Sequence, residues 1–133
     1  MRLLLDTNIL IDLSSRQEFA GLSEPDLFEM VVGSNPFLVS VVSIWEIEIK
    51  TRLKKLSLSI KVDQLSDLVK IAGGVVLTVT QDHILTQLST EPDTRDPFDR
   101  LLLTTAAAED ALLVTRDRAL QAHPLVWKPS FPT

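Results

Sequence analysis

The sequence predicts an α/β fold built around a mainly parallel sheet. Short apolar runs alternate with stretches of helical character, and no linker, repeat or low-complexity tract interrupts them. Such alternation is typical of parallel strands joined by returning helices. With 133 residues the chain lies within the usual range of one domain, so we expect a single domain over residues 1–133.

Local patterns predict each element in turn. Helix 23–33 is expected because Ser23 and Asp26 resemble a capping box and Gly33 a stop signal. The glycine pair at 73–74 is expected to end the helix that precedes it, and Thr80 is a suitable N-cap for the next one. The predicted strands are 2–6, 37–41, 75–79 and 112–115. The predicted helices are 7–15, 23–33, one that begins near Ser43, 62–74, a short one after Thr80 and 97–110. The tail is expected to add an edge strand before its prolines end regular structure.

Composition excludes several kinds of site. The absence of cysteine removes disulfides, thiolate zinc sites and cysteine nucleophiles, and it fits a reducing compartment. No apolar run approaches the roughly 18 to 20 residues that cross a bilayer, and we identify no signal peptide, so a cytoplasmic protein without a membrane partner is expected. The net charge of −5 argues against indiscriminate nucleic-acid binding, so a nucleic-acid substrate would require something that offsets this charge.

Four acidic residues follow predicted strands or begin the adjoining helices. They are Asp6 at the end of the first strand, Glu46 in the first turn after 37–41, Asp99 in the first turn of the helix that leads into the last strand, and Asp117 just after that strand. Carboxyl ends of parallel strands and the following helix N-termini meet at one edge of a sheet. We therefore expect the four carboxylates to converge there.

Each acid also has a purely structural interpretation. Ser43 and Glu46 have the S-x-x-E spacing of a capping box, and taken alone this is the favoured interpretation of Glu46. Asp96 is a suitable N-cap, Pro97 suits the first helical position, and the helix dipole favours an acid such as Asp99 in the first turn. The other two acids could simply begin turns after strands.

Convergence favours a functional site over four unrelated caps. Crowded carboxylates repel one another and raise one another's pKa unless a cation holds them. An all-oxygen cluster suits Mg²⁺ or Mn²⁺ better than zinc, and such an ion could join an acidic protein to a phosphodiester and activate water for its hydrolysis. Thr7 and Thr115 adjoin the acids and could orient ligands or water, although strand-end threonines are more often ordinary turn or strand residues.

Four motifs occur in a characteristic order along the chain: "LLLDTNILI", "VSVVSIWEIEIK", "RDPFDRLLLTTAAAED" and "LLVTRDRAL". In order and spacing they resemble PIN-domain ribonucleases of the VapC toxin type, and the resemblance covers nearly the whole chain. One departure is visible, since "DTN" and "DTR" stand where many relatives carry histidines. Asn8 and Arg95 therefore leave the RNA preference open.

The resemblance implies a three-layer α/β/α sandwich with a central, mainly parallel sheet. It implies a Mg²⁺- or Mn²⁺-dependent endoribonuclease, the toxin of a toxin–antitoxin pair, with an RNA substrate (transfer or ribosomal RNA in many members), a cognate antitoxin and a homodimeric state. The residues that correspond to the family's metal-binding and catalytic acids are Asp6, Glu46, Asp99 and Asp117.

Other features carry weaker expectations. The basic cluster "KTRLKK" at 50–55 could reach an RNA backbone, or it could be a solvated helix end. Arg100 and Arg116 adjoin acids of the cluster and could pair with them or with phosphate. His83 and His123 are expected at the surface or internally satisfied, and the aromatic residues Trp45 and Phe98 are expected to pack.

Three competing hypotheses remain open at this stage. A signalling receiver also gathers acids at a sheet edge, but it requires a phosphoacceptor aspartate after a middle strand and a lysine after a late one, and the chain fits that pattern poorly. A dehalogenase-like phosphatase requires D-x-D, whereas Asn8 stands at the second acidic position. The last is a catalytically silent binding module in which the acids only cap helices.

Overall fold

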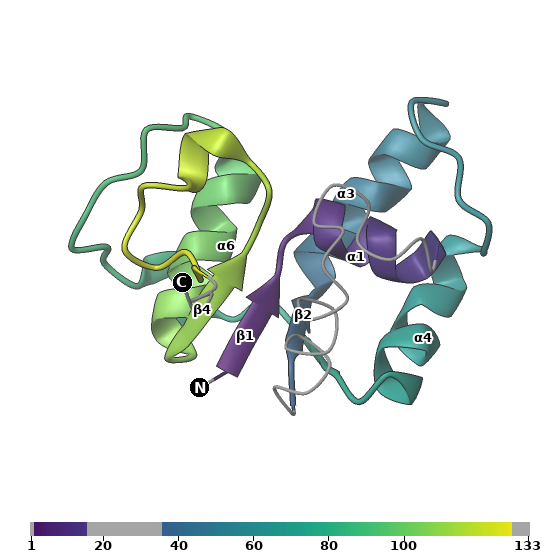
Figure 1. Ribbon diagram of the computed structural model, residues 1–133, viewed down its shortest axis with the longest axis horizontal. Helices are drawn as coiled ribbons and strands as arrows, with labels where there is room; N and C mark the ends of the chain where they lie inside the picture. Colours follow the sequence, from purple (N-terminus) through teal and green to yellow (C-terminus); the bar gives the residue numbers. More distant parts are fainter. Residues whose placement is uncertain (1, 16–35, 129–133) are drawn as a thin grey trace, which may run out of the picture.

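The structure, a computed structural model, describes residues 2–15 and 36–128 (Figure 1). The helix predicted over 23–33 and the last five residues of the tail lie outside the described residues. No helix in the described part of the chain is long and apolar enough to cross a membrane.

Four parallel strands form the central sheet, as predicted. They are β1 (Arg2–Leu5), β2 (Leu38–Ser40), β3 (Val75–Leu77) and β4 (Ala111–Val114), in the order β3-β2-β1-β4. The first three strands add in one direction and β4 lies on the other side of β1. The carboxyl ends of β1 and β4 therefore flank the switch point of the topology, where open α/β sheets place their sites.

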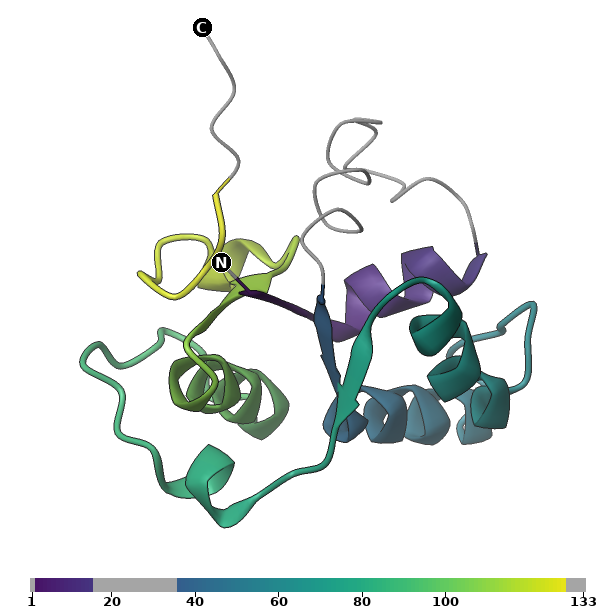
Figure 2. The same ribbon diagram turned by 90° about the horizontal axis from the view of Figure 1, so that it is seen from below.

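Helices cover both faces of this sheet. Those among the described residues are α1 (Thr7–Ser15), α3 (Val41–Arg52), α4 (Leu65–Ile71), α5 (Gln81–Leu85) and α6 (Pro97–Ala108), with 3₁₀ turns η1 (Val62–Gln64) and η2 (Arg118–Leu120). Figures 1 and 2 show α1 and α6 on opposite sides of β1. The three-layer α/β/α arrangement implied by the sequence is confirmed.

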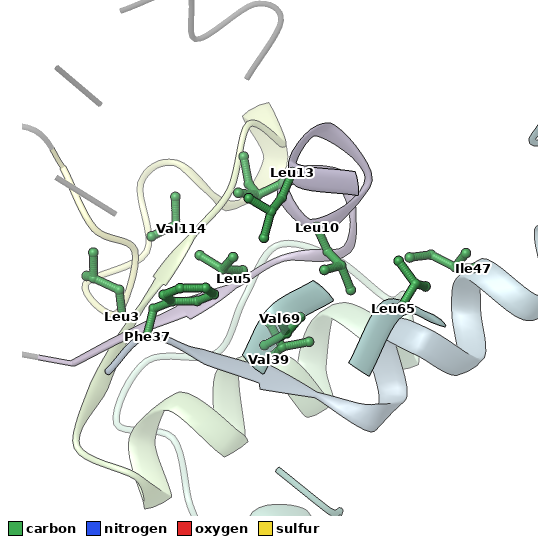
Figure 3. Close-up of a cluster of buried hydrophobic side chains, with 11 residues drawn as sticks. Leu3, Leu5, Leu10, Leu13, Phe37, Val39, Ile47, Leu65, Val69 and Val114 are labelled. Carbon is green, nitrogen blue, oxygen red and sulfur yellow. The ribbon is translucent and has the colours of Figure 1, made fainter. Parts of the chain in front are cut away.

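Alternation along β1 separates two cores. Leu3 and Leu5 point to a cluster that includes Leu10 of α1 and Val69 of α4, and Figure 3 shows these side chains in one group with Phe37. The intervening residue of the strand, Leu4, belongs to a second cluster with residues of α6 and β4. Successive strand residues face opposite sides, so one short strand anchors both layers.

The start of α3 differs from the prediction. Ser40 is the N-cap, and its Oγ accepts a hydrogen bond from the backbone N–H of Val42 at 3.1 Å, so the helix begins two residues before Ser43. Ser43 is fully buried in the first turn, and Glu46 lies in the second turn. The alternative interpretation of Ser43 and Glu46 as a capping box is therefore wrong, because the strand passes into the helix without a loop and Ser40 already provides the cap.

Other boundaries follow the sequence closely. Helix 7–15 and the Thr80 cap of α5 are confirmed. Segment 62–74 divides into η1 and α4 before Gly73, whose φ of 95° ends the helix. The tail extends the sheet edge by one isolated parallel bridge between Leu113 and Val126. Trp45 packs on Phe98 with ring centroids 5.3 Å apart, yet it stays 59% exposed, more than expected of a packing residue.

Candidate active site

Asp6 occupies the switch point of the sheet. It follows β1 directly, its backbone N–H donates to the Val114 carbonyl at 2.9 Å, and it is only 5% exposed. Its Oδ1 accepts from the backbone N–H of Thr7 at 2.7 Å, and its Oδ2 accepts from Thr115 Oγ1 at 2.5 Å. Both carboxylate oxygens are thus oriented by the residues that follow β1 and β4.

The two threonines connect Asp6 to two other predicted site residues. The Thr7 hydroxyl donates to Glu46 Oε1 at 2.6 Å, which links α1 to α3. Thr115 Oγ1 accepts from the backbone N–H of Asp117 at 3.0 Å. The interpretation of both threonines as ordinary strand-end residues is therefore incomplete, since both hydroxyls form hydrogen bonds to predicted site acids.

Asp117 and Glu46 each have a second interaction. Asp117 Oδ1 accepts from the backbone N–H of Ala119 at 3.0 Å and so caps η2. Glu46 Oε2 lies 3.2 Å from Lys50 Nζ, one turn further along α3. The turn-starting interpretation of Asp117 holds, and it leaves the residue next to Thr115 at the carboxyl end of β4.

Asp99 is positioned by the start of α6. Asp96 is the N-cap and its Oδ1 accepts from the backbone N–H of Phe98 at 2.9 Å, while Pro97 begins the helix, as predicted. Asp99 therefore lies in the first turn, where Thr94 Oγ1 donates to its Oδ2 at 3.1 Å. Cap and site acid are separate residues with separate partners.

Electrostatic repulsion reaches from Asp6 to the other three acids. Burial is the main cause of the raised pKa of Asp6, which Glu46 and Asp117 raise further against the hydrogen bonds from Thr115 and Thr7. Burial also raises the pKa of Asp99 to about 6, with further repulsion from Asp96, Asp6 and Asp117. Asp6 thus interacts with each of the other three acids.

A divalent cation suits the chemistry of this donor set. The four acids supply only oxygen atoms, and the pKa values of Asp6 and Asp99 are raised in the way that a nearby cation would reverse. As placed, no three acidic or histidine side chains among the described residues form a ready-made metal site. Binding an ion there would require the carboxylates to draw together.

Several neighbouring contacts were not foreseen. The bond from Thr94 to Asp99 crosses the loop before α6, and Arg116 pairs with Asp12 of α1 at 2.8 Å. Asp12 is 8% exposed, and burial raises its pKa despite this partner. An acid inside the apolar run "ILIDL" was the available sequence signal.

The remaining predicted candidates lie outside the cluster. Arg100 forms an ion pair with Glu91, so it does not pair with the acids next to it. Both histidines are buried and hydrogen-bonded, which is one of the two alternatives expected for them. His83 Nε2 lies 2.7 Å from a carboxylate oxygen of Glu109, and His123 Nε2 lies 2.8 Å from the Thr90 carbonyl oxygen. Neither is at the surface.

Comparisons with known proteins agree with this architecture. The family model described as "PIN domain" matches residues 3–124. The chain resembles the structure of VapBC2 from Rickettsia felis bound to a DNA fragment from their promoter (TM-score 0.58, 17% identity, 95% of this chain and 96% of that chain). It also resembles a toxin–antitoxin complex from Klebsiella pneumoniae (TM-score 0.59, 21% identity, 96% of this chain and 97% of that chain). These two structural likenesses concern the fold, and the search of curated proteins found no significant match.

Proposed function

The chain belongs to the PIN-domain family, and we propose that it is a metal-dependent endoribonuclease that acts as the toxin of a toxin–antitoxin pair. The observation that carries this proposal is the electrostatic repulsion between Asp6, at the switch point of the sheet, and the other three acids, with raised pKa values at Asp6 and Asp99. Family membership also removes the receiver and the dehalogenase-like phosphatase as hypotheses.

The proposed ligands of Mg²⁺ or Mn²⁺ are Asp6, Glu46, Asp99 and Asp117. When bound, the ion would supply activation of the attacking water and charge stabilisation at the scissile phosphate. The protein's own contribution is orientation, because Thr7 and Thr115 fix both oxygens of the Asp6 carboxylate. The Thr7 hydroxyl also donates to Glu46, so one threonine orients Asp6 and Glu46 relative to each other.

The proposed partners follow from the same family. An RNA substrate fits a cluster that an ion would couple to a phosphodiester. A cognate antitoxin is supported by the two structural neighbours, which are VapBC2 and a toxin–antitoxin complex. A homodimer remains part of the proposal. Transfer RNA and ribosomal RNA are the substrates that we would test first.

Cleavage of RNA by the purified protein tests the proposal. We expect cleavage with Mg²⁺ or Mn²⁺, arrest by EDTA, and loss of cleavage in the Asp6→Asn, Asp99→Asn double variant, which should also no longer arrest growth when induced in cells. Cleavage by the double variant at the wild-type rate would contradict the proposal. Mapping cellular RNA after brief induction, against the same variant, would identify the substrate.

A second candidate function is a catalytically silent PIN-like module that only binds a protein. It is favoured by the finding that no three acidic or histidine side chains in the described part of the chain are already arranged to hold an ion. Calorimetric titration with Mn²⁺ separates the two, because the silent module predicts no saturable heat whereas the nuclease predicts binding that the double variant lacks.

A further inference from the structure

A groove of about 690 Å³ lies under the C-terminal end of α3, where the chain continues toward η1. Its lining includes Lys54, Lys55, Lys61 and Thr51, together with aliphatic side chains such as Leu56, and no acidic or aromatic residue belongs to it. Figure 1 shows the connection between α3 and α4 on the side of the molecule opposite β4 and the C-terminal segment.

Positive charge is concentrated around this groove. Residues 50–61 hold five of the 13 Lys and Arg residues and no acid, so the other eight cations and 18 acids leave the rest of the chain at −10. Lys50 and Arg52 are paired with glutamates of α3. The three groove lysines are exposed, and none has a carboxylate partner among the described residues.

Lys54 stands at a backbone position that favours glycine. Its φ is 59°, and its N–H donates to the Thr51 carbonyl at 3.0 Å while the N–H of Lys55 donates to the Lys50 carbonyl at 2.9 Å. This is the Schellman ending of a helix, in which glycine is usual at the left-handed residue because a Cβ is unfavourable there. The chain instead places an ammonium group on the groove, a local conflict of the kind expected at functional positions.

The exposed lining of the groove matches an anion rich in acceptor oxygens. It presents three lysine ammonium groups, each with three N–H donors, and no acidic side chain. The Thr51 hydroxyl oxygen is buried beneath this surface and takes no part in it.

We propose that this lysine groove binds the phosphodiester backbone of the RNA substrate away from the scissile bond, an inference that rests on the proposed nuclease function. Glu46 and the groove residue Thr51 are separated by about 7.5 Å along the axis of α3, so one helix joins the acidic cluster to the groove. Because no aromatic side chain lines it, the groove has no platform for stacking bases and contacts the backbone independently of sequence. It also supplies the offset for the net negative charge of the protein.

Lys54→Gly is the sharpest test, because stability and binding should move in opposite directions. Glycine suits the positive φ, so the variant should melt at the same or a higher temperature than the wild type. Its affinity for a fluorescein-labelled single-stranded RNA, measured by anisotropy in EDTA to prevent cleavage, should nevertheless fall. Misfolding cannot explain a weaker binder that is more stable.

The Lys54→Gly, Lys55→Gln double variant extends the test with a salt titration. Each lost phosphate contact lowers the slope of log K against log salt by about 0.7, so we expect a decrease of about 1.4. The matched control is Lys70→Gln, Lys128→Gln, which removes the same charge from exposed positions that do not line the groove. This control should keep the wild-type slope.

The outcomes separate this inference from the proposed function. If the wild type cleaves RNA while the groove variant keeps the wild-type affinity and salt slope, the groove inference is overturned, an acidic protein segment becomes the better ligand class, and the nuclease stands. If the wild type neither binds nor cleaves RNA, the proposed function fails and the groove inference fails with it.

Discussion

The two ends of helix α6 shift the pKa of a carboxylate in opposite directions. At its C-terminal end Glu109 is bound by His83 at 2.7 Å and by Arg2 at 3.4 Å, and the hydrogen bond from His83 is the main reason that its pKa is lowered. At its N-terminal end Asp99 lies among other acids, and burial together with their repulsion raises its pKa to about 6. The acid at the C-terminal end therefore has basic partners within the fold, whereas the acid at the N-terminal end has acidic neighbours.

This difference distinguishes a structural acid from a functional one. An ion pair inside the fold satisfies both groups, whereas a half-buried acid held among other acids lowers stability unless a ligand compensates. Strongly perturbed carboxylates at a sheet edge are therefore candidates for chemistry. Substitutions at the two ends of α6 should affect different properties of the protein, and three predictions test this, with a fourth at Thr115 that tests how Asp6 is oriented.

The largest effect is expected at Asp99. Asp99→Asn should lower the RNA cleavage rate on the order of 10²- to 10³-fold, as removal of one preorganised electrostatic group does in other active sites, while the metal-free fold stays intact. Asp96→Asn is the matched control three residues away, because asparagine also caps helices well. A similar loss of rate in both folded variants would contradict the division between cap and site.

A smaller loss is expected at Thr115, which orients Asp6. Thr115→Val keeps the size of the side chain but removes the 2.5 Å hydrogen bond to Asp6 and the acceptor for the Asp117 N–H. By analogy with residues that orient metal ligands, cleavage and Mn²⁺ affinity should fall about 10- to 100-fold. Thr105→Val, a buried threonine whose hydroxyl bonds its own helix, should leave both unchanged.

At the opposite end of α6 the effect should be on stability alone. Glu109→Leu leaves the buried His83 Nε2 without its partner, which costs about 1–3 kcal/mol of unfolding free energy. Urea denaturation measures this change, and the cleavage rate of the folded variant should equal that of the wild type. A loss of cleavage without a loss of stability would reverse the assignment of the two helix ends.

Local patterns in the sequence were sufficient for part of this architecture. Asp6 directly ends a buried strand, and Asp96 with Pro97 begins a helix, so the positions of Asp6 and Asp99 follow from neighbouring residues. The start of α3 was misplaced because Ser40 and Ser43 are both plausible caps. Only the packing of β2 decides between them, and the sequence does not show that packing.

Contacts between distant segments account for what was missed. The hydrogen bond from Thr115 to Asp6 joins residues 109 apart in the chain, and the bond from His83 to Glu109 joins residues 26 apart. Such pairings depend on strand order and register, which single-sequence patterns leave open. Hydroxyls that orient an acid look in sequence like any threonine beside a strand end, so their role emerges only in three dimensions.

The smallest effect that we predict is a pair of opposite pH dependences. The folded-state pKa of Asp99 is about 6, above its ordinary value of 3.8, so between these values the folded protein binds more protons than the unfolded chain. In EDTA the Asp99 carboxyl therefore lowers the free energy of unfolding as pH rises from 3.8 to about 6. Asp99→Asn should lack this decrease, so its stability relative to the wild type should rise over that interval and then level off.

Glu109 should show the reverse sign, because its pKa is lowered below the ordinary value of 4.5. Its stabilisation is present above that value and is lost as pH falls through the folded-state pKa. The deficit of Glu109→Leu relative to the wild type should therefore shrink in acid. Urea unfolding of the three proteins across this pH range measures both slopes. If the stability of both variants relative to the wild type changed with pH in the same direction, the pKa values of Asp99 and Glu109 would be shifted in the same direction. That result would contradict the comparison on which the site assignment depends.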